Sequence, residues 1–166
     1  IKNINPNFLT EPLKVLQSMG AKLDIGNNYI KIFPSENIYG TNLETQPYPG
    51  FPTDLQAQIM ALMSIAKGQS QIKEKIFENR FMHVSELNRL GANIRITNDT
   101  AYIQGEQKLK GAPVMASDLR ASVSLVLAGL CAEGQTTINR TYHLDRGYEK
   151  IEETLGKCGP KITRVK

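Results

Sequence analysis

The sequence predicts a mixed α/β (α+β) fold with internal pseudo-symmetry, because a unit of about 65 residues occurs more than once. The segment TDLQAQIMALMSIAKGQSQI, which begins at Thr53, is echoed by SDLRASVSLVLAGLCAEGQTTI, which begins at Ser117. Each copy has a hydroxyl residue, Asp-Leu, an apolar helical stretch, Gly-Gln and a β-rich run. In a second echo, ENRFMHVSELNRLGANI matches LDRGYEKIEETLGKCGPKI, so that Arg80 corresponds to Arg146.

A third, partial copy of the unit comes first in the chain. The LKVLQSMGAKLDI that ends at Ile25 matches the LNRLGANIRI that ends at Ile96. We therefore predict a partial repeat over residues 1–35, followed by repeats over residues 36–105 and 106–166. Each complete unit is expected to run strand, helix, strand, helix, strand, strand.

The elements of the middle repeat follow from local patterns. NLET, which ends at Thr45, predicts a strand, and residues 54–67 predict a helix because their apolar residues recur at helical spacing. Residues 70–75 alternate as a strand does. Residues 83–90 predict a second helix that ends at Gly91, since glycine adopts the left-handed conformation without a Cβ penalty.

The other repeats carry equivalent signals. Gly20 and Gly159 end the helices that correspond to residues 83–90, and short β pairs follow in the first repeat (KLDI, YIKIF) and the middle one (NIRI, AYIQ). One such unit cannot complete a core alone, so successive units should pack their helices around a pseudo-threefold axis with the sheets outside. The sequence PYPGFP over residues 47–52 predicts a rigid loop between a strand and a helix.

The composition excludes several classes of protein. Of the 166 residues 40% are hydrophobic and 22% charged, and the net charge of +4 is too small for a nucleic-acid surface but compatible with anionic small molecules. Two cysteines and two histidines predict neither a disulfide framework nor a metal site. The longest apolar stretch is far shorter than the ~20 residues of a membrane span, and the start at Ile1 shows no signal peptide. We therefore expect a cytoplasmic protein.

Two aspartates stand in matching places at predicted helix starts. Thr53 or Asp54 could cap the middle helix and Asp118 the next one, with each aspartate offsetting the helix dipole. Alternatively, a carboxylate held behind the proline-rich loop could be a general base or a ligand for a substrate hydroxyl.

Three arginines are the other candidate site residues. Arg120 lies in the first turn of an apolar helix, where the dipole disfavours a cation, so either a salt bridge or an anionic ligand should compensate. Arg80 and Arg146 occupy matching places, which the repeat would bring to the same rim with Arg120. The histidines, His83 and His143, have no nucleophile partner at suitable spacing and are interpreted as structural or loop residues.

Four long blocks follow one another in a match that runs from near Glu11 to the end of the chain: PYPGFPTDLQAQIMAL, IFENRFMHVSELNRLGANI, APVMASDLRASVSLVLAG and YHLDRGYEKIEETL. They closely resemble successive motifs of the bacterial UDP-N-acetylglucosamine 1-carboxyvinyltransferases, enolpyruvyl transferases of peptidoglycan synthesis. The resemblance implies an inside-out α/β barrel (prism) of βαβαββ repeats, with helices inside and sheets outside. It also implies that residues 1–166 form one incomplete domain of a two-domain enzyme.

The resemblance further implies transfer of the enolpyruvyl group of phosphoenolpyruvate to the 3′-hydroxyl of UDP-N-acetylglucosamine, without a metal or other cofactor. Asp54 matches the family's catalytic aspartate, which binds the sugar hydroxyl and is assigned as its base, and Ile76 matches a backbone contact to the UDP-sugar. Arg120 and Arg146 match arginines of the family that bind phosphoenolpyruvate, and Asp118 matches an acidic neighbour of the reacting centre. Arg80 matches a supporting arginine.

Other family motifs are not found in these 166 residues: an N-terminal Lys-Asn pair, an Arg-Pro uridine-binding segment and a loop with a Cys or Asp general acid. The resemblance therefore implies that the other domain of the same chain supplies them and that this part alone is inactive. Two alternatives stay open. One is the shikimate-pathway enolpyruvyl transferase, and the other is a non-catalytic RNA-binding module of the related cyclase fold.

Overall fold

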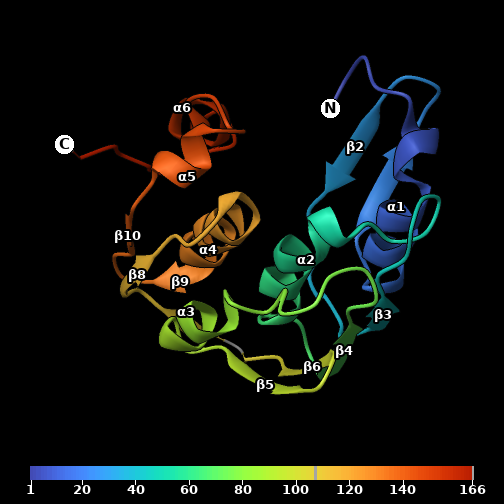
Figure 1. Cartoon of the computed structure of the whole chain (residues 1–166). Helices are drawn as coiled ribbons and strands as arrows, with labels where there is room; N and C mark the ends of the chain where they lie inside the picture. The colour runs from blue at the N-terminus through green and yellow to red at the C-terminus, as the bar shows by residue number, and fades with distance from the viewer. Residues whose placement is uncertain (107, 166) are drawn as a thin grey trace.

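Strands and helices alternate along the computed structural model, which describes residues 1–106 and 108–165 (Figure 1). The first repeat contains η1 (Pro6–Leu9), α1 (Thr10–Ser18), β1 (Lys22–Ile25) and β2 (Ile30–Phe33). The middle repeat contains β3 (Asn42–Glu44), η2 (Thr53–Leu55), α2 (Gln56–Met63), β4 (Gln69–Lys73), α3 (Val84–Arg89), β5 (Asn93–Thr97) and β6 (Thr100–Gln104). The last repeat contains β7 (Leu109–Lys110), β8 (Pro113–Met115), α4 (Leu119–Cys131), β9 (Ala132–Glu133), β10 (Thr137–Asn139), α5 (Tyr142–Asp145) and α6 (Ile151–Gly156).

The strands pair in the same way at the start of two of the predicted repeats. In the middle repeat β3 pairs in parallel with β4, and in the last repeat β8 pairs in parallel with β10. The sheet of the middle repeat continues through the antiparallel strands β6 and β5, in the order β3-β4-β6-β5. After α6, the described residues 157–165 contain no strand. No counterpart of the hairpin that β5 and β6 form in the middle repeat is therefore seen among these described residues.

Two glycines show how closely the repeats correspond. A Cβ added to Gly40 would lie 2.2 Å from the carbonyl oxygen of Gln69, and one added to Gly111 would lie 2.4 Å from that of Gln135. Neither approach leaves room for a side chain. Gly40 precedes β3 as Gly111 precedes β8, so both copies use the same close backbone contact.

Helices α2 and α4 lie side by side inside the molecule, and the sheets lie on its outside (Figure 1). Both helices are apolar around most of their circumference, which is typical of a helix buried on all sides. The core they build combines side chains from all three repeats, for example Met19, Met60, Leu90 and Leu125. No helix in the described parts of the chain is long and apolar enough to cross a membrane.

The predicted helix ends are confirmed, whereas one helix start is not. Gly20, Gly91 and Gly159 have φ values of +94°, +92° and +109°, as the left-handed stops require. The helix expected over residues 54–67 begins as the 3₁₀ turn η2 and is α-helical only through Met63. The prediction that Thr53 or Asp54 caps it is wrong, because neither side chain accepts a capping hydrogen bond.

Candidate active site

Asp54 is the meeting point of charged side chains from separate elements. It lies in η2, and its Oδ1 is 2.5 Å from Nε of Arg120 in the first turn of α4. The same oxygen is 3.5 Å from Nη2 of Arg80, which follows β4. Its side chain is nevertheless 59% exposed. The fold thus gathers one reachable carboxylate and two guanidinium groups at the start of the inner helices.

Asp118 behaves differently from its counterpart Asp54. One of its carboxylate oxygens accepts hydrogen bonds from the backbone N–H of Arg120 at 2.9 Å and of Ala121 at 3.0 Å, so its predicted cap of α4 is confirmed. Burial raises the pKa of Asp118, but these bonds, the Ser117 hydroxyl and nearby His83 outweigh it, and the pKa falls below its ordinary value. Asp118 is therefore a fixed anion at the helix start.

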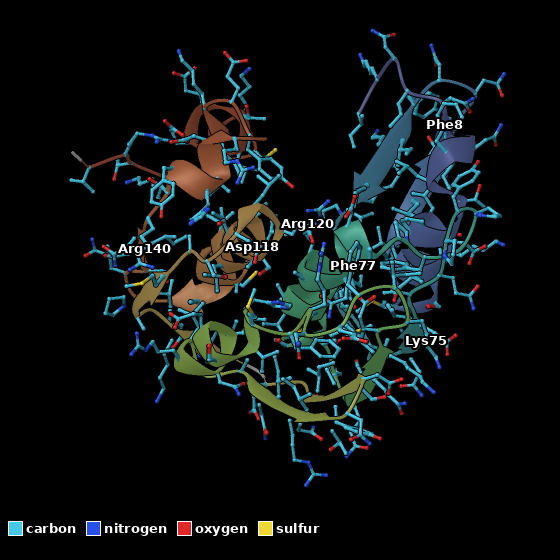
Figure 2. All side chains as sticks on the ribbon, viewed as in Figure 1. Phe8, Lys75, Phe77, Asp118, Arg120 and Arg140 are labelled. Carbon is cyan, nitrogen blue, oxygen red and sulfur yellow. The ribbon has the colours of Figure 1, made fainter. Side chains whose placement is uncertain are left out.

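Arg120 contacts both carboxylates: its guanidinium pairs with Asp54, and its backbone N–H donates to Asp118. Figure 2 shows it beside Asp118 at the end of α4 that faces α2. Its hydrogen bond to Asp54 raises its pKa most, burial opposes this, and the negative charges of Asp54 and Asp118 add to the rise. Of the two alternatives for this cation, a salt bridge is present. Because 39% of the side chain remains exposed, an anionic ligand can also reach it.

Arg80 is the least exposed of these arginines. Its side chain is 23% exposed, and its guanidinium carbon lies 4.8 Å from the ring centroid of Phe77. Nη2 is buried and makes no hydrogen bond within the described residues, although it forms an ion pair with Asp54 at 3.5 Å. A donor in this position is available to a ligand.

Arg146 is exposed and forms no ion pair with any residue in 1–106 or 108–165. The next residue, Gly147, packs against the start of α4: a Cβ there would lie 2.9 Å from Cδ1 of Leu119. The fold brings the backbone of Arg146 near Arg120. The expected convergence of its side chain with Asp54 and Asp118 stays a prediction.

Ile76 lies in the segment between β4 and Arg80. Its backbone N–H donates to Oε1 of Glu74 at 2.9 Å, so only its carbonyl is left for a backbone contact with a ligand. Ile76, Phe77 and Arg80 line a cavity of about 630 Å³ together with Asn98 and Asp99 from the β5–β6 turn. The cavity gives the predicted sugar-binding segment an open side.

His83 lies next to the candidate site, and its burial agrees with its interpretation as a structural residue. The residue is 3% exposed, and Nε2 has no hydrogen-bond partner among the described residues. Its pKa is lowered to about 4: burial is the largest cause, the charge of Asp118 opposes it, and the charge of Arg80 adds to the lowering. The ring is therefore neutral and close to both charged groups. In the sequence, only the spacing of three residues after Arg80 indicates that His83 lies near the site, and this spacing does not reveal its burial.

The unfolding free energy should fall by about 3 kcal/mol between pH 6.5 and pH 4 because of His83. The unfolded imidazole takes a proton below pH 6.5, whereas the folded one does so only near pH 4, so acid favours the unfolded chain. Urea unfolding at pH 7 and pH 4 measures the loss. His83→Asn should remove most of it and His143→Asn should not; an equal loss in the His83→Asn variant would contradict the assignment.

No group of three or more His, Cys, Asp or Glu side chains within residues 1–106 and 108–165 could hold a metal ion. The candidate site is therefore described by its arginines and carboxylates. The guanidinium groups of arginines bind phosphate and carboxylate oxygens, and a carboxylate can accept a proton from a hydroxyl.

Comparison with known proteins decides the family. The profile of the family described as EPSP synthase (3-phosphoshikimate 1-carboxyvinyltransferase) matches residues 1–155. The chain belongs to the EPSP synthase family. Within this family, the chain resembles the UDP-N-acetylglucosamine 1-carboxyvinyltransferase of Bartonella tribocorum, with 57% identity over 99% of the chain. It is also 58% identical to the protein of that name from Azorhizobium caulinodans, over 96% of the chain. The chain spans 39% and 37% of the length of these two relatives.

Solved structures confirm the fold of this EPSP synthase family member. The enolpyruvyl transferase NikO from Streptomyces tendae superposes with a TM-score of 0.85 at 29% identity, over 93% of this chain and 36% of that one. An EPSP synthase from Acinetobacter baumannii gives 0.77 at 20% identity, over 99% of this chain and 41% of that one, and shows the fold alone. The mixed α/β class and the resemblance are confirmed. Closure of the barrel stays a prediction.

Proposed function

We propose that the complete protein containing this chain transfers the enolpyruvyl group of phosphoenolpyruvate to the 3′-hydroxyl of UDP-N-acetylglucosamine and releases phosphate. This is the first committed step of peptidoglycan synthesis and takes place in the cytoplasm. The observation that carries the proposal is the Asp54–Arg120 pair. It lies in a chain 57% identical to a protein named for this reaction.

Each residue has a role in the proposed reaction. The 3′-oxygen bonds to C2 of phosphoenolpyruvate while Asp54 accepts the hydroxyl proton, and a general acid outside these 166 residues protonates C3. Loss of a C3 proton and of phosphate then restores the double bond. Arg120 and Arg146 hold the anionic groups, and Asp118 lies beside the reacting centre. The exposure of Asp54 and its contact with Arg120 support these roles for the two residues.

The UDP-sugar is proposed to bind along the segment that leads to Arg80. The carbonyl of Ile76 contacts the sugar, and Arg80 supports the site, since its Nη2 has no hydrogen bond in the described parts of the chain. The repeats 1–35, 36–105 and 106–166 form one incomplete domain in this proposal. The remaining site residues come from a second domain of the same chain, in line with the greater length of the relatives.

The complete protein, mixed with phosphoenolpyruvate and UDP-N-acetylglucosamine, should release phosphate and form an enolpyruvyl ether at the 3′-oxygen. Phosphate release and mass spectrometry of the product measure this, and a chelator should leave the rate unchanged. The isolated 166 residues should show no turnover. Turnover with shikimate 3-phosphate as the only acceptor would favour the shikimate enzyme instead. Strong, salt-dependent RNA binding without turnover would favour the RNA-binding module.

A further inference from the structure

Glu74, directly after β4, is a buried carboxylate that the proposed reaction does not use. It is 5% exposed, and no Lys or Arg forms an ion pair with it in the described parts of the chain. A carboxylate is buried at high cost unless hydrogen-bond donors surround it. Its donors come from two segments of the candidate active site.

The first pair of donors comes from the two ends of the proline-rich loop. The hydroxyl of Thr45 donates to Oε1 of Glu74 at 2.7 Å, and the hydroxyl of Thr53 donates to Oε2 at 2.9 Å. Thr45 in turn accepts a hydrogen bond from the backbone N–H of Lys75 at 2.9 Å. Because Asp54 follows Thr53, Glu74 fixes the point from which the Asp54 side chain starts.

The second pair of donors comes from the proposed sugar-binding segment. The backbone N–H groups of Ile76 and Phe77 donate to Oε1 of Glu74 at 2.9 Å and 3.2 Å. These bonds set the direction of the peptide groups at this turn. The carboxylate of Glu74 is thus a shared anchor for the segment that ends in Asp54 and the segment that contains Ile76.

The last repeat shows what the fold does without this anchor. The backbone N–H of Thr45 donates to the Lys73 carbonyl at 2.9 Å, and that of Ala116 donates to the Asn139 carbonyl at 3.0 Å, so Ala116 corresponds to Thr45. Arg140, at the position of Glu74, is exposed and lies at the far side of α4 from Arg120 in the view of Figure 2.

Without the loop, Ser117 follows Ala116 directly, and Asp118 caps its own helix. In the middle repeat, the corresponding Thr53 hydroxyl is used by Glu74, and Asp54 makes no cap. The structural core of the repeat therefore does not require a carboxylate at this position. The one in the middle repeat serves the loop and Asp54.

We infer that Glu74 is a positioning residue, which holds the Asp54 carboxylate at a fixed place relative to the Ile76 carbonyl so that both contact one acceptor sugar. The inference rests on the proposed function. A misplaced base or carbonyl weakens sugar binding and proton transfer together, because a displacement of about 1 Å can cost as much as 10²-fold in rate. Phosphoenolpyruvate, held by Arg120 and Arg146, should be bound as before.

Thr53→Val tests the inference in the complete protein, because it removes the donor to Oε2 and keeps the shape of the side chain. We expect KM for UDP-N-acetylglucosamine to rise about tenfold and kcat to fall about tenfold, with KM for phosphoenolpyruvate within about twofold. Glu74→Gln should act in the same direction. Thr53→Ser, which keeps the hydroxyl, should restore both constants.

Ser64→Ala is the matched control, since Ser64 is buried at the other end of α2 and its hydroxyl also makes a 2.9 Å hydrogen bond, to the Met60 carbonyl. It should leave all three constants unchanged. The inference is overturned if Thr53→Val only lowers the folded fraction, or if it raises KM for both substrates equally.

Hydrogen exchange separates this inference from the proposed function. In Thr53→Val the peptide containing the amides of Ile76 and Phe77 should exchange about tenfold faster than in the Ser64→Ala variant, whatever the activity. If the unmodified protein shows no turnover, the proposed function fails, and this exchange rate alone decides whether Glu74 couples the two segments. Unchanged exchange would refute the coupling.

Discussion

Asp54→Asn in the complete protein should lower turnover of phosphoenolpyruvate and UDP-N-acetylglucosamine by roughly 10² to 10⁴-fold, with the folded structure intact. Asparagine keeps the size of the side chain but cannot accept the proton of the 3′-hydroxyl. A capping aspartate would contribute about 1 kcal/mol to stability, but Asp54 makes no capping bond and is 59% exposed, so the melting temperature should hardly change. Steady-state kinetics and thermal unfolding of the same preparation measure both quantities.

Glu133→Gln is the matched control for Asp54→Asn. Glu133 is 62% exposed and pairs with Lys108 at 2.5 Å, so it resembles Asp54 in exposure and in its ion pair but lies in β9, outside the candidate site. Its amide variant should keep normal turnover. Near-normal turnover of the Asp54→Asn variant would show that the carboxylate is not the base and serves only to pair Arg120 and Arg80.

Arg120→Met should raise KM for phosphoenolpyruvate by roughly 10²-fold or more, because a hydrogen bond to a charged group is worth about 1.5–3 kcal/mol and a guanidinium can make two. The variant should be as stable as the unmodified protein, or slightly more stable. A cation in the first turn of α4 opposes the helix dipole, and its removal relieves that repulsion. Initial rates at varied phosphoenolpyruvate and urea unfolding provide the two measurements.

Arg89→Met serves as the control for Arg120, since Arg89 is 59% exposed and pairs with Glu86 at 3.8 Å in the last turn of α3. It should leave KM unchanged. An unchanged KM together with lower stability in the Arg120→Met variant would make Arg120 a structural partner of Asp54 and not a ligand for the anion.

The two substitutions are not independent. In the structure Arg120 is paired with Asp54, so an anion that binds Arg120 competes with that carboxylate. We therefore expect Asp54 to be released from this guanidinium when the anion binds. The double variant should therefore lose less than the product of the two single losses, which is the behaviour of groups in direct contact.

The order of elements and the repeat could be predicted from the sequence. Apolar spacing in residues 56–63 and 119–131, the glycine stops at Gly20, Gly91 and Gly159, and the alternation of β4 are local properties that burial in any compact fold preserves. The match between the two Asp-Leu segments then placed Asp54 and Asp118 at equivalent helix starts. The sequence by itself therefore determined the fold class and the candidate charged residues.

Only the tertiary structure decided what those residues do. The patterns of Asp54 and Asp118 are equivalent in sequence, yet Asp118 caps a helix and Asp54 contacts Arg80 and Arg120. The difference depends on Glu74, whose partners Thr45 and Thr53 are 29 and 21 residues away. The burial of His83 is likewise invisible in the sequence. Hydrogen bonds and desolvation between distant segments depend on how the repeats pack, and no local pattern encodes that geometry.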